Sequence, residues 1–94
     1  MTQPTSAVRD NTALHRFELD VDGSVAFANY RRTANADIIT HTETPHALRG
    51  RGVASQLIKG ALDLIRADGR RVVAGCSFVV DYLQKHPEDA DLEA

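Results

Sequence analysis

The chain is poor in cysteine and has no surplus of charge of either sign. Its 94 residues contain one cysteine, and 11 Lys and Arg residues against 13 Asp and Glu give a formal net charge of −2. A single cysteine excludes an internal disulfide framework and is typical of a reducing compartment. The near balance of charge gives no global electrostatic reason to bind nucleic acid or a membrane surface, so any anion site must be local.

Long hydrophobic runs and aromatic side chains are also scarce. No apolar run approaches the roughly 20 residues that a membrane-spanning helix needs, and residues 1–13 lack the apolar segment of a secretory signal. Aromatic residues make up 5% of the chain, which argues against a single-stranded nucleic-acid site built on base stacking. We therefore expect a cytoplasmic protein that binds neither nucleic acid nor membranes.

What remains is the composition of one small soluble domain, 43% hydrophobic and 26% charged. Residues 1–13 are polar and without periodicity, and we interpret them as a flexible tail. The domain proper is expected to cover residues 14–90. After Pro87, which ends the last predicted helix, the acidic segment is expected to fray, and residues 91–94 are taken as a C-terminal tail.

The first half of the domain predicts three strands, at residues 15–21, 24–32 and 37–43. Apolar and charged residues alternate in the first strand, and Asp22-Gly23 predicts a type I′ hairpin turn into the second. In the second strand Val25 and Phe27 are expected on one face, and Ala26, Ala28 and Tyr30 on the other. The alternation in the third strand places Ile39, His41 and Glu43 together on one face and Ile38, Thr40 and Thr42 on the other.

The second half predicts a helix, a buried strand and a last helix. Apolar residues recur at helical spacing from about Gly50 to Asp68, and Gly69 is placed to cap the helix C-terminus. Val72-Val73-Ala74 is a continuous apolar run, typical of a strand buried on both faces. Ser77 is expected to cap the last helix. The order β-β-β-α-β-α predicts a mixed α/β sheet in which an antiparallel meander feeds one parallel βαβ unit.

The loop between the third strand and the long helix carries the strongest functional signal. In Leu48-Arg49-Gly50-Arg51-Gly52-Val53-Ala54, two glycines allow successive amides to converge, and the helix N-terminus adds its positive dipole. Two arginines stand where cations are unfavourable for the helix itself. This pattern predicts a phosphate or pyrophosphate site, the alternative being a plain glycine turn before a helix.

Two common phosphate motifs are excluded by the spacing. A P-loop requires Gly-Lys-Ser/Thr at the end of the glycine-rich run, and a dinucleotide fingerprint requires a third glycine and an acidic residue after the next strand. Here the next strand ends in Gly75-Cys76. The remaining pattern, Arg-x-x-Gly-x-Ala at Arg49, Gly52 and Ala54, resembles the coenzyme A pyrophosphate motif of the GNAT N-acetyltransferase superfamily.

The resemblance extends over about residues 14 to 90. Besides the loop, it rests on His41-Thr42-Glu43, Cys76, Tyr82-Leu83 and His86-Pro87-Glu88, which are similar to the short single-domain YjdJ-type branch of that superfamily. One departure is Asp89, where an aromatic residue is expected in this branch. The resemblance implies an acetyl-CoA-binding fold in which the strands at 37–43 and 71–76 splay apart around the pantetheine arm.

The resemblance also implies where the cofactor binds. The expected contacts come from the two splayed strands and from the loop between strand and helix. They are Thr42, Glu43, Arg49, Gly50, Arg51, Gly52, Val53, Ala54 and Cys76.

Four side chains are candidates for catalysis. Cys76 lies before a helix N-terminus, which favours a thiolate, and is either an acetyl carrier or a wall of the thioester channel. His41 and Glu43 share one strand face, and either is a candidate base for an attacking amine, although both are also ordinary strand residues. Tyr82 is a candidate acid toward the CoA thiolate or a core aromatic. His41 and His46 lack a third ligand, so no metal site is predicted.

We therefore interpret the sequence as an acetyl-CoA-dependent N-acetyltransferase acting on an unidentified amine, either a small molecule or a protein. The usual helices between the first two strands are missing, which predicts an open acceptor site in a monomer or weak homodimer. Two alternatives stay open. One is a non-catalytic acyl-CoA-binding or sensing module, and the other is a site for a different phosphorylated ligand.

Overall fold

The computed structural model describes residues 8–94. Five strands form one sheet in sequence order: β1 (Arg9–Asn11), β2 (Arg16–Val21), β3 (Ser24–Arg32), β4 (Ala36–Glu43) and β5 (Arg71–Ala74). Strands β1 to β4 are antiparallel neighbours, whereas β4 and β5 are parallel and are joined through helix α1 (Val53–Ala67). Helix α2 (Ser77–Lys85) and two 3-10 helices, η1 (His46–Leu48) and η2 (Pro87–Leu92), complete the fold. The predicted mixed sheet with one parallel unit is confirmed.

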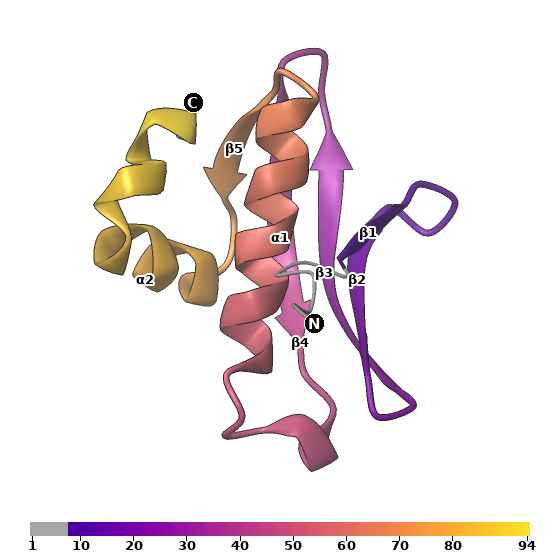
Figure 1. Ribbon diagram of the computed structural model, residues 1–94. Helices are drawn as coiled ribbons and strands as arrows, with labels where there is room; N and C mark the ends of the chain where they lie inside the picture. The colour runs from indigo at the N-terminus through magenta and orange to yellow at the C-terminus, as the bar shows by residue number, and fades with distance from the viewer. Residues whose placement is uncertain (1–7) are drawn as a thin grey trace, which may run out of the picture.

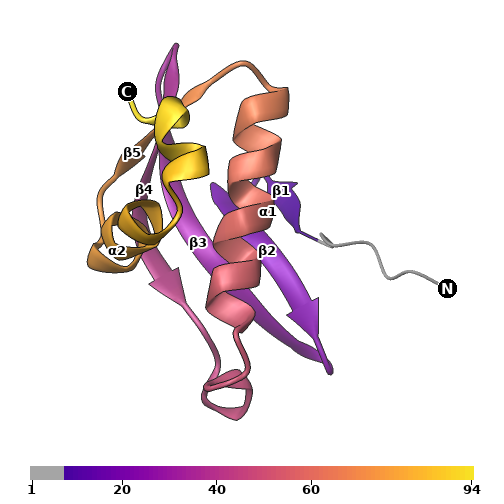
Figure 2. The same ribbon diagram turned by 60° about the vertical axis from the view of Figure 1, so that its left-hand side comes forward.

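Both helices cover the same face of the sheet (Figures 1 and 2), and the core lies between them and that face. The burial of β5 follows from this arrangement. Val72 faces the helices and is fully buried, whereas Val73 points to the opposite face and is 37% exposed. The prediction that this strand is buried on both faces was therefore wrong, because helices pack on one side of it in the part of the chain described here.

The predicted turn and helix signals have the expected backbone geometry. Asp22 and Gly23 have φ angles of 51° and 80°, and Val21 pairs with Ser24 across this two-residue turn. Helix α1 ends in a Schellman motif, in which Gly69 has φ 72° and its N–H donates to the Arg66 carbonyl at 3.1 Å. The helix begins at Val53 rather than near Gly50.

The N-terminal segment departs from the expected tail. Residues 1–7 lie outside the described part, but Arg9–Asn11 forms β1 and pairs with β2. The strand is polar because its side chains meet polar partners: Asp10 accepts hydrogen bonds from the Tyr30 hydroxyl and the Arg32 guanidinium. A three-residue edge strand held by such pairs leaves no apolar alternation in the sequence, so the prediction of a tail through residue 13 was wrong there.

The C-terminal segment is also ordered, contrary to the expected fraying. Leu92 is 4% exposed, and the Ala94 N–H donates to the Val72 carbonyl at 3.0 Å along the edge of β5. Asp89, the residue that departs from the resembled branch, is buried and pairs with Arg66. At the start of α2, Cys76 rather than Ser77 is the N-cap residue, and its side chain makes no capping hydrogen bond.

Candidate active site

Strands β4 and β5 separate halfway along β4. Their pairing runs from Ala36 and Arg71 to Ile39 and Ala74, and the last link is the Gly75 N–H, which donates to the Ile39 carbonyl at 2.8 Å. Beyond that bond β4 continues to Glu43, while the chain after β5 turns into α2. A β-carbon on Gly75 would lie 2.8 Å from the Ile39 oxygen. Glycine is therefore needed at the last hydrogen bond between the two strands, where a side chain would clash with the Ile39 carbonyl.

A β-bulge in β4 decides which side chains face this opening. Asn29 pairs with His41 but Tyr30 pairs with Ile39, so Thr40 is an extra residue, and its hydroxyl donates to the Asn29 carbonyl at 3.4 Å. The extra residue reverses the side-chain alternation. Ile39 stays with the buried face, whereas His41 and Glu43 lie on the open face. The predicted grouping of these three residues on one face was therefore wrong.

Thr42 and Cys76 meet across the opening. Thr42 pairs with the fully buried Ala28 and so faces the helices, and its Oγ1 lies 3.4 Å from the Cys76 Sγ in hydrogen-bonding geometry. Cys76 is partly buried and is the N-cap residue of α2. The structure thus brings together two of the sequence-predicted contacts, one from each diverging strand end.

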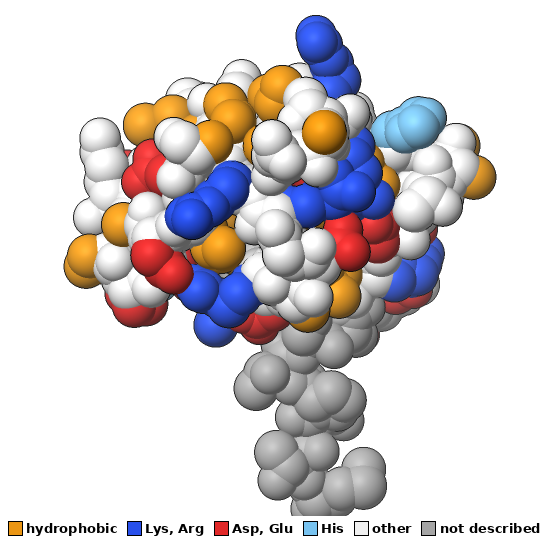
Figure 3. All heavy atoms as spheres, turned by 90° about the horizontal axis from the view of Figure 1, so that it is seen from above, with side chains coloured by type: hydrophobic (Ala, Val, Ile, Leu, Met, Phe, Trp, Pro, Cys, Tyr) orange, Lys and Arg blue, Asp and Glu red, His pale blue; other side chains and the backbone are white. Residues whose placement is uncertain are grey.

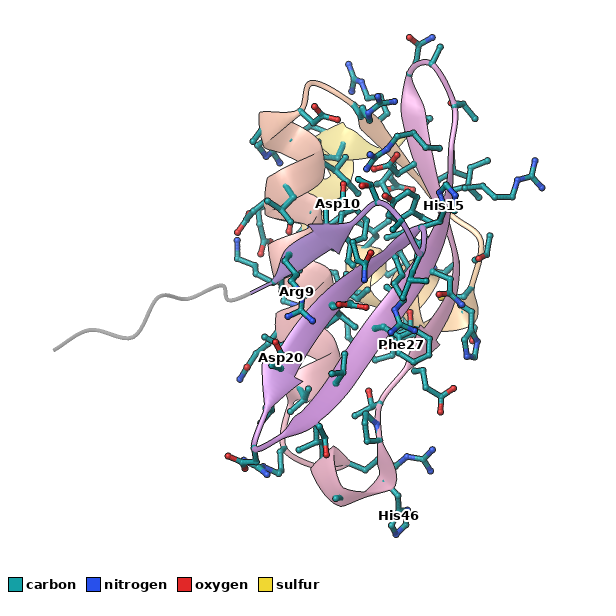
Figure 4. The ribbon with its side chains drawn as sticks, turned by 90° about the vertical axis from the view of Figure 1, so that its right-hand side faces the viewer. Arg9, Asp10, His15, Asp20, Phe27 and His46 are labelled. Atoms are coloured by element: carbon teal, nitrogen blue, oxygen red, sulfur yellow. The ribbon has the colours of Figure 1, made fainter. Side chains whose placement is uncertain are left out.

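His41 and Glu43 form a pair on the open face. The His41 Nε2 lies 2.9 Å from Glu43 Oε1, and the two side chains are 56% and 45% exposed. In the β3–β4 ladder His41 pairs with Asn29 and Glu43 pairs with Phe27. Figure 4 labels Phe27 on this part of the sheet.

The glycine loop has the backbone conformation that its sequence predicts. Gly50 and Gly52 have φ angles of 79° and 75°, in the left-handed region that favours glycine. Gly52 is the N-cap of α1 and has no side chain to cap the first-turn amides. Those amides, with the positive end of the helix dipole, therefore remain available for an anionic ligand.

A cavity of about 220 Å³ opens at this loop. Its lining combines residues of the predicted loop with Thr44, Ser55 and Phe78, which were not predicted to lie there. The lining residues are Thr44, Leu48, Arg49, Gly50, Gly52, Val53, Ala54, Ser55 and Phe78. Phe78 comes from α2, so α2 and the loop share one pocket.

The two loop arginines differ in their contacts. The Arg49 Nε donates to the Thr44 carbonyl at 3.3 Å, and within residues 8–94 no ion pair to a carboxylate is seen for it. Arg51 instead forms an ion pair with Asp22 of the β2–β3 turn, with 2.8 Å between Nη2 and Oδ2. Arg49 is thus the loop cation that is free to meet a phosphate.

Three arginines toward the opposite end of the molecule, Arg32, Arg66 and Arg70, are paired with acids. Figure 3 views that end and shows blue and red side chains interleaved. Arg32 binds the buried Asp37 through Nε at 2.7 Å, and this bond, followed by that to Asp10, raises its pKa. Two cavities of about 330 and 350 Å³ adjoin Arg32. Because the Arg32 guanidinium already binds two carboxylates, these cavities are less suited to bind a phosphate than the glycine loop is.

Tyr82 lies deeper in the C-terminal layer than the other candidates. It is 4% exposed, and its ring stacks on His86 with 4.0 Å between ring centroids. Burial, followed by the charges of Asp89 and Glu88, raises its pKa, so the phenol keeps its proton at neutral pH. It lies six residues after Cys76, the N-cap residue of α2, or roughly 9 Å along the helix axis.

Residues 8–94 contain neither a candidate metal site nor a candidate membrane-spanning helix. No group of three or more histidine, cysteine, aspartate or glutamate side chains there is arranged to hold a metal ion. None of the helices in this part of the chain is long and apolar enough to cross a membrane.

Comparison with known proteins agrees with this geometry. The family model of the GCN5-related N-acetyltransferases matches residues 16–92. Protein NATD1 of Xenopus tropicalis is 29% identical over 96 residues, covering 96% of this chain and 87% of that protein. Human protein NATD1 is 36% identical over 55 residues, which span 58% of this chain and 49% of the human protein.

The fold also matches a solved structure. The solution structure of a GCN5-like protein from Staphylococcus aureus superposes with a TM-score of 0.70 at 24% identity, covering 98% of this chain and 91% of that one. At that identity the match concerns the fold. The family model, which spans most of the domain, shows that the chain belongs to the GCN5-related N-acetyltransferase family.

Proposed function

We propose that this protein transfers the acetyl group of acetyl-CoA to an amine. The observation that carries the proposal is the alignment of three features along β4. They are the glycine loop with Arg49, the cavity that Phe78 shares with it, and the strand opening bounded by Thr42 and Cys76. A cofactor with an anionic end and an extended arm fits that order, because the loop offers amides and charge and the opening offers strand edges.

The roles of the side chains follow from their positions. Amides of Gly50 to Ala54 would hold the pyrophosphate, with Arg49 adding charge. Beyond the Gly75 bond, the β4 edge facing the opening has no β5 partner, so its N–H groups would stabilise charge on the acetyl oxygen. Thr42 and Cys76 would line the thioester channel, and the Cys76 sulfur would lie beside the acetyl group.

Proton transfer is assigned to the open face and to α2. A neutral amine attacks the thioester carbonyl, its proton passes to His41 or Glu43, and the CoA sulfur leaves with the bonding electrons. The His41–Glu43 contact of 2.9 Å orients the imidazole toward this task. Tyr82, whose pKa is raised chiefly by burial, holds a proton for the departing thiolate.

A calorimetric titration with acetyl-CoA, with CoA and ATP as comparators, tests the cofactor site. We expect acetyl-CoA and CoA to bind and ATP to bind more weakly. Gly52→Asp should raise the Kd for CoA about tenfold or more, and each tenfold corresponds to about 1.4 kcal/mol of binding free energy. Gly69→Asp is the matched control. Gly69 has φ 72° against 75° for Gly52, both have nothing within 4 Å of an added β-carbon, and Gly69 lies at the other end of α1. No binding of any CoA species, or equal loss in both variants, would refute the site.

A non-catalytic acyl-CoA-binding module is the second candidate. It is favoured by the exposure of His41 and Glu43 and by the distance of the buried Tyr82 along α2 from Cys76. Cys76→Ala, His41→Ala and Glu43→Ala separate the two functions. If the protein is an enzyme, at least one of these variants loses acetyl transfer while retaining acetyl-CoA binding. If no amine or protein acceptor is turned over and the variants change binding alone, the binding module is the correct function.

A further inference from the structure

One loop arginine is held away from the phosphate site by the neighbouring hairpin. Arg51 lies between the two left-handed glycines, yet its Nη2 is 2.8 Å from Oδ2 of Asp22, the first residue of the β2–β3 turn. The two side chains are 49% and 68% exposed. Figure 4 shows the hairpin turn and the loop near His46 at the same lower end of the molecule.

The turn holds the backbone of Asp22 in place. Asp22 has φ 51° and Gly23 φ 80°, and the strands on either side pair directly from Val21 to Ser24. A two-residue turn locked to two strands gives the carboxylate little freedom to follow a moving partner. Arg51 has a longer side chain with more rotamers, so it is the member of the pair that can exchange partners.

We propose that Asp22 sets the affinity of this site for coenzyme A by competing with the pyrophosphate for Arg51. This inference rests on the proposed function. An exposed pair between single charges is weak, whereas a guanidinium and a phosphate form stronger charge-assisted hydrogen bonds. When the ligand binds, Arg51 exchanges the Asp22 carboxylate for phosphate oxygens, and Asp22 remains beside the site as an unfavourable negative charge.

The competition acts on the anionic end of the ligand and not on the acetyl group. Acetyl-CoA and CoA carry the same phosphates, so Asp22 weakens both by the same factor. It therefore favours release of the product CoA as much as it disfavours capture of the substrate. Asp22 acts through Arg51, which makes it a positioning residue rather than a catalytic one.

The test is a calorimetric titration of CoA into Asp22→Asn, Asp20→Asn, Arg51→Gln and the Asp22→Asn, Arg51→Gln double variant. Asparagine tolerates the left-handed backbone that this turn requires, so Asp22→Asn removes the charge and keeps the hairpin. Asp20→Asn is the matched control. It removes the same charge from the same hairpin, at a residue that pairs with Arg9 instead. Thermal melts of each variant establish that it folds.

We expect Asp22→Asn to bind CoA and acetyl-CoA about three- to tenfold more tightly at low salt, an effect that shrinks as salt screens exposed charges. Asp20→Asn is expected to change affinity by less than about twofold, because its charge is neutralised by Arg9 and it does not touch the loop. In the Arg51→Gln background the gain from Asp22→Asn disappears. Equal effects of Asp22→Asn and Asp20→Asn, or a gain that persists without Arg51, would overturn the role of Asp22.

These outcomes are separable from a failure of the proposed function. If the unaltered, folded protein and all variants fail to bind CoA, the cofactor site itself is refuted, and the role of Asp22 falls with it. If the unaltered protein and all variants bind CoA with the same affinity, the cofactor site is supported and only the proposed competition by Asp22 is refuted.

Discussion

Replacing Gly75 by alanine tests the point at which the two parallel strands separate. The added methyl group would lie 2.8 Å from the Ile39 carbonyl oxygen and 3.3 Å from the Ile38 Cγ2. Real β-carbons essentially never approach a backbone atom that closely. Gly75 lies outside the left-handed region, so the backbone itself accepts alanine and the cost is steric.

The expected loss follows from the atoms that must move. The Ile39 oxygen belongs to the central part of β4 and accepts the Gly75 N–H, so relief of the clash requires the two strands to part and that bond to lengthen. Overpacking of this kind costs about 1–3 kcal/mol. For a domain of this size, about 2 kcal/mol corresponds to a fall in Tm of roughly 8–16 °C.

Urea denaturation and thermal melts measure the loss, and amide hydrogen exchange at residue 75 locates it. We expect faster exchange there in Gly75→Ala, because the bond to Ile39 is weakened. Gly69→Ala provides the comparison, since it introduces left-handed strain of about 1–2 kcal/mol at a site with nothing within 4 Å and leaves residue 75 unaffected. A melt within about 2 °C of the unaltered protein, with unchanged exchange at residue 75, would refute the reasoning.

Three further predictions concern stability. Asp37→Asn leaves the Arg32 guanidinium with one carboxylate in place of two. We expect urea denaturation to show a free energy of unfolding lower by about 3 kcal/mol. An unchanged free energy of unfolding would argue against a structural role for the Arg32–Asp37 pair. Burial alone would raise the pKa of Glu18, but hydrogen bonds from three donors outweigh burial, so the pKa is lowered in the folded state. Glu18 therefore stabilises the fold fully above its unfolded-state pKa, and this stabilisation is lost as pH falls through the folded-state pKa. Glu18→Gln should accordingly flatten the fall of Tm between about pH 6 and 3. An unchanged slope would contradict this. Leu92→Ala should cost about 2 kcal/mol, whereas a frayed C-terminus would tolerate it without loss.

Several features of this protein are local and could be predicted from the sequence. The Asp22-Gly23 turn, the apolar stripe of α1 and its glycine cap each follow from a few neighbouring residues whose backbone preferences agree. The parallel pair β4 and β5 follows from the order of strand, helix and strand. The backbone of the glycine loop could be anticipated for the same reason, since Gly50 and Gly52 adopt the left-handed conformation expected of glycines before a helix.

Other features required contacts between residues distant in sequence. The bulge at Thr40 leaves no mark in the alternation of β4, yet it moves His41 and Glu43 away from Ile39 and brings Thr42 to Cys76. Strand β1 is too polar for its pattern to be seen. It is held by ion pairs to β2 and β3.

The division between the two groups has one physical cause. Backbone preference and hydrophobic periodicity act over a few residues, so the sequence alone determined strands β2 to β5, helices α1 and α2, their order and the glycine loop. Side-chain partners across the sheet are determined by tertiary packing, which depends on all the neighbouring elements at once. The tertiary structure therefore decided which face each β4 side chain takes, how both ends of the chain are held, and that Arg51 of the loop is bound to Asp22 of the hairpin.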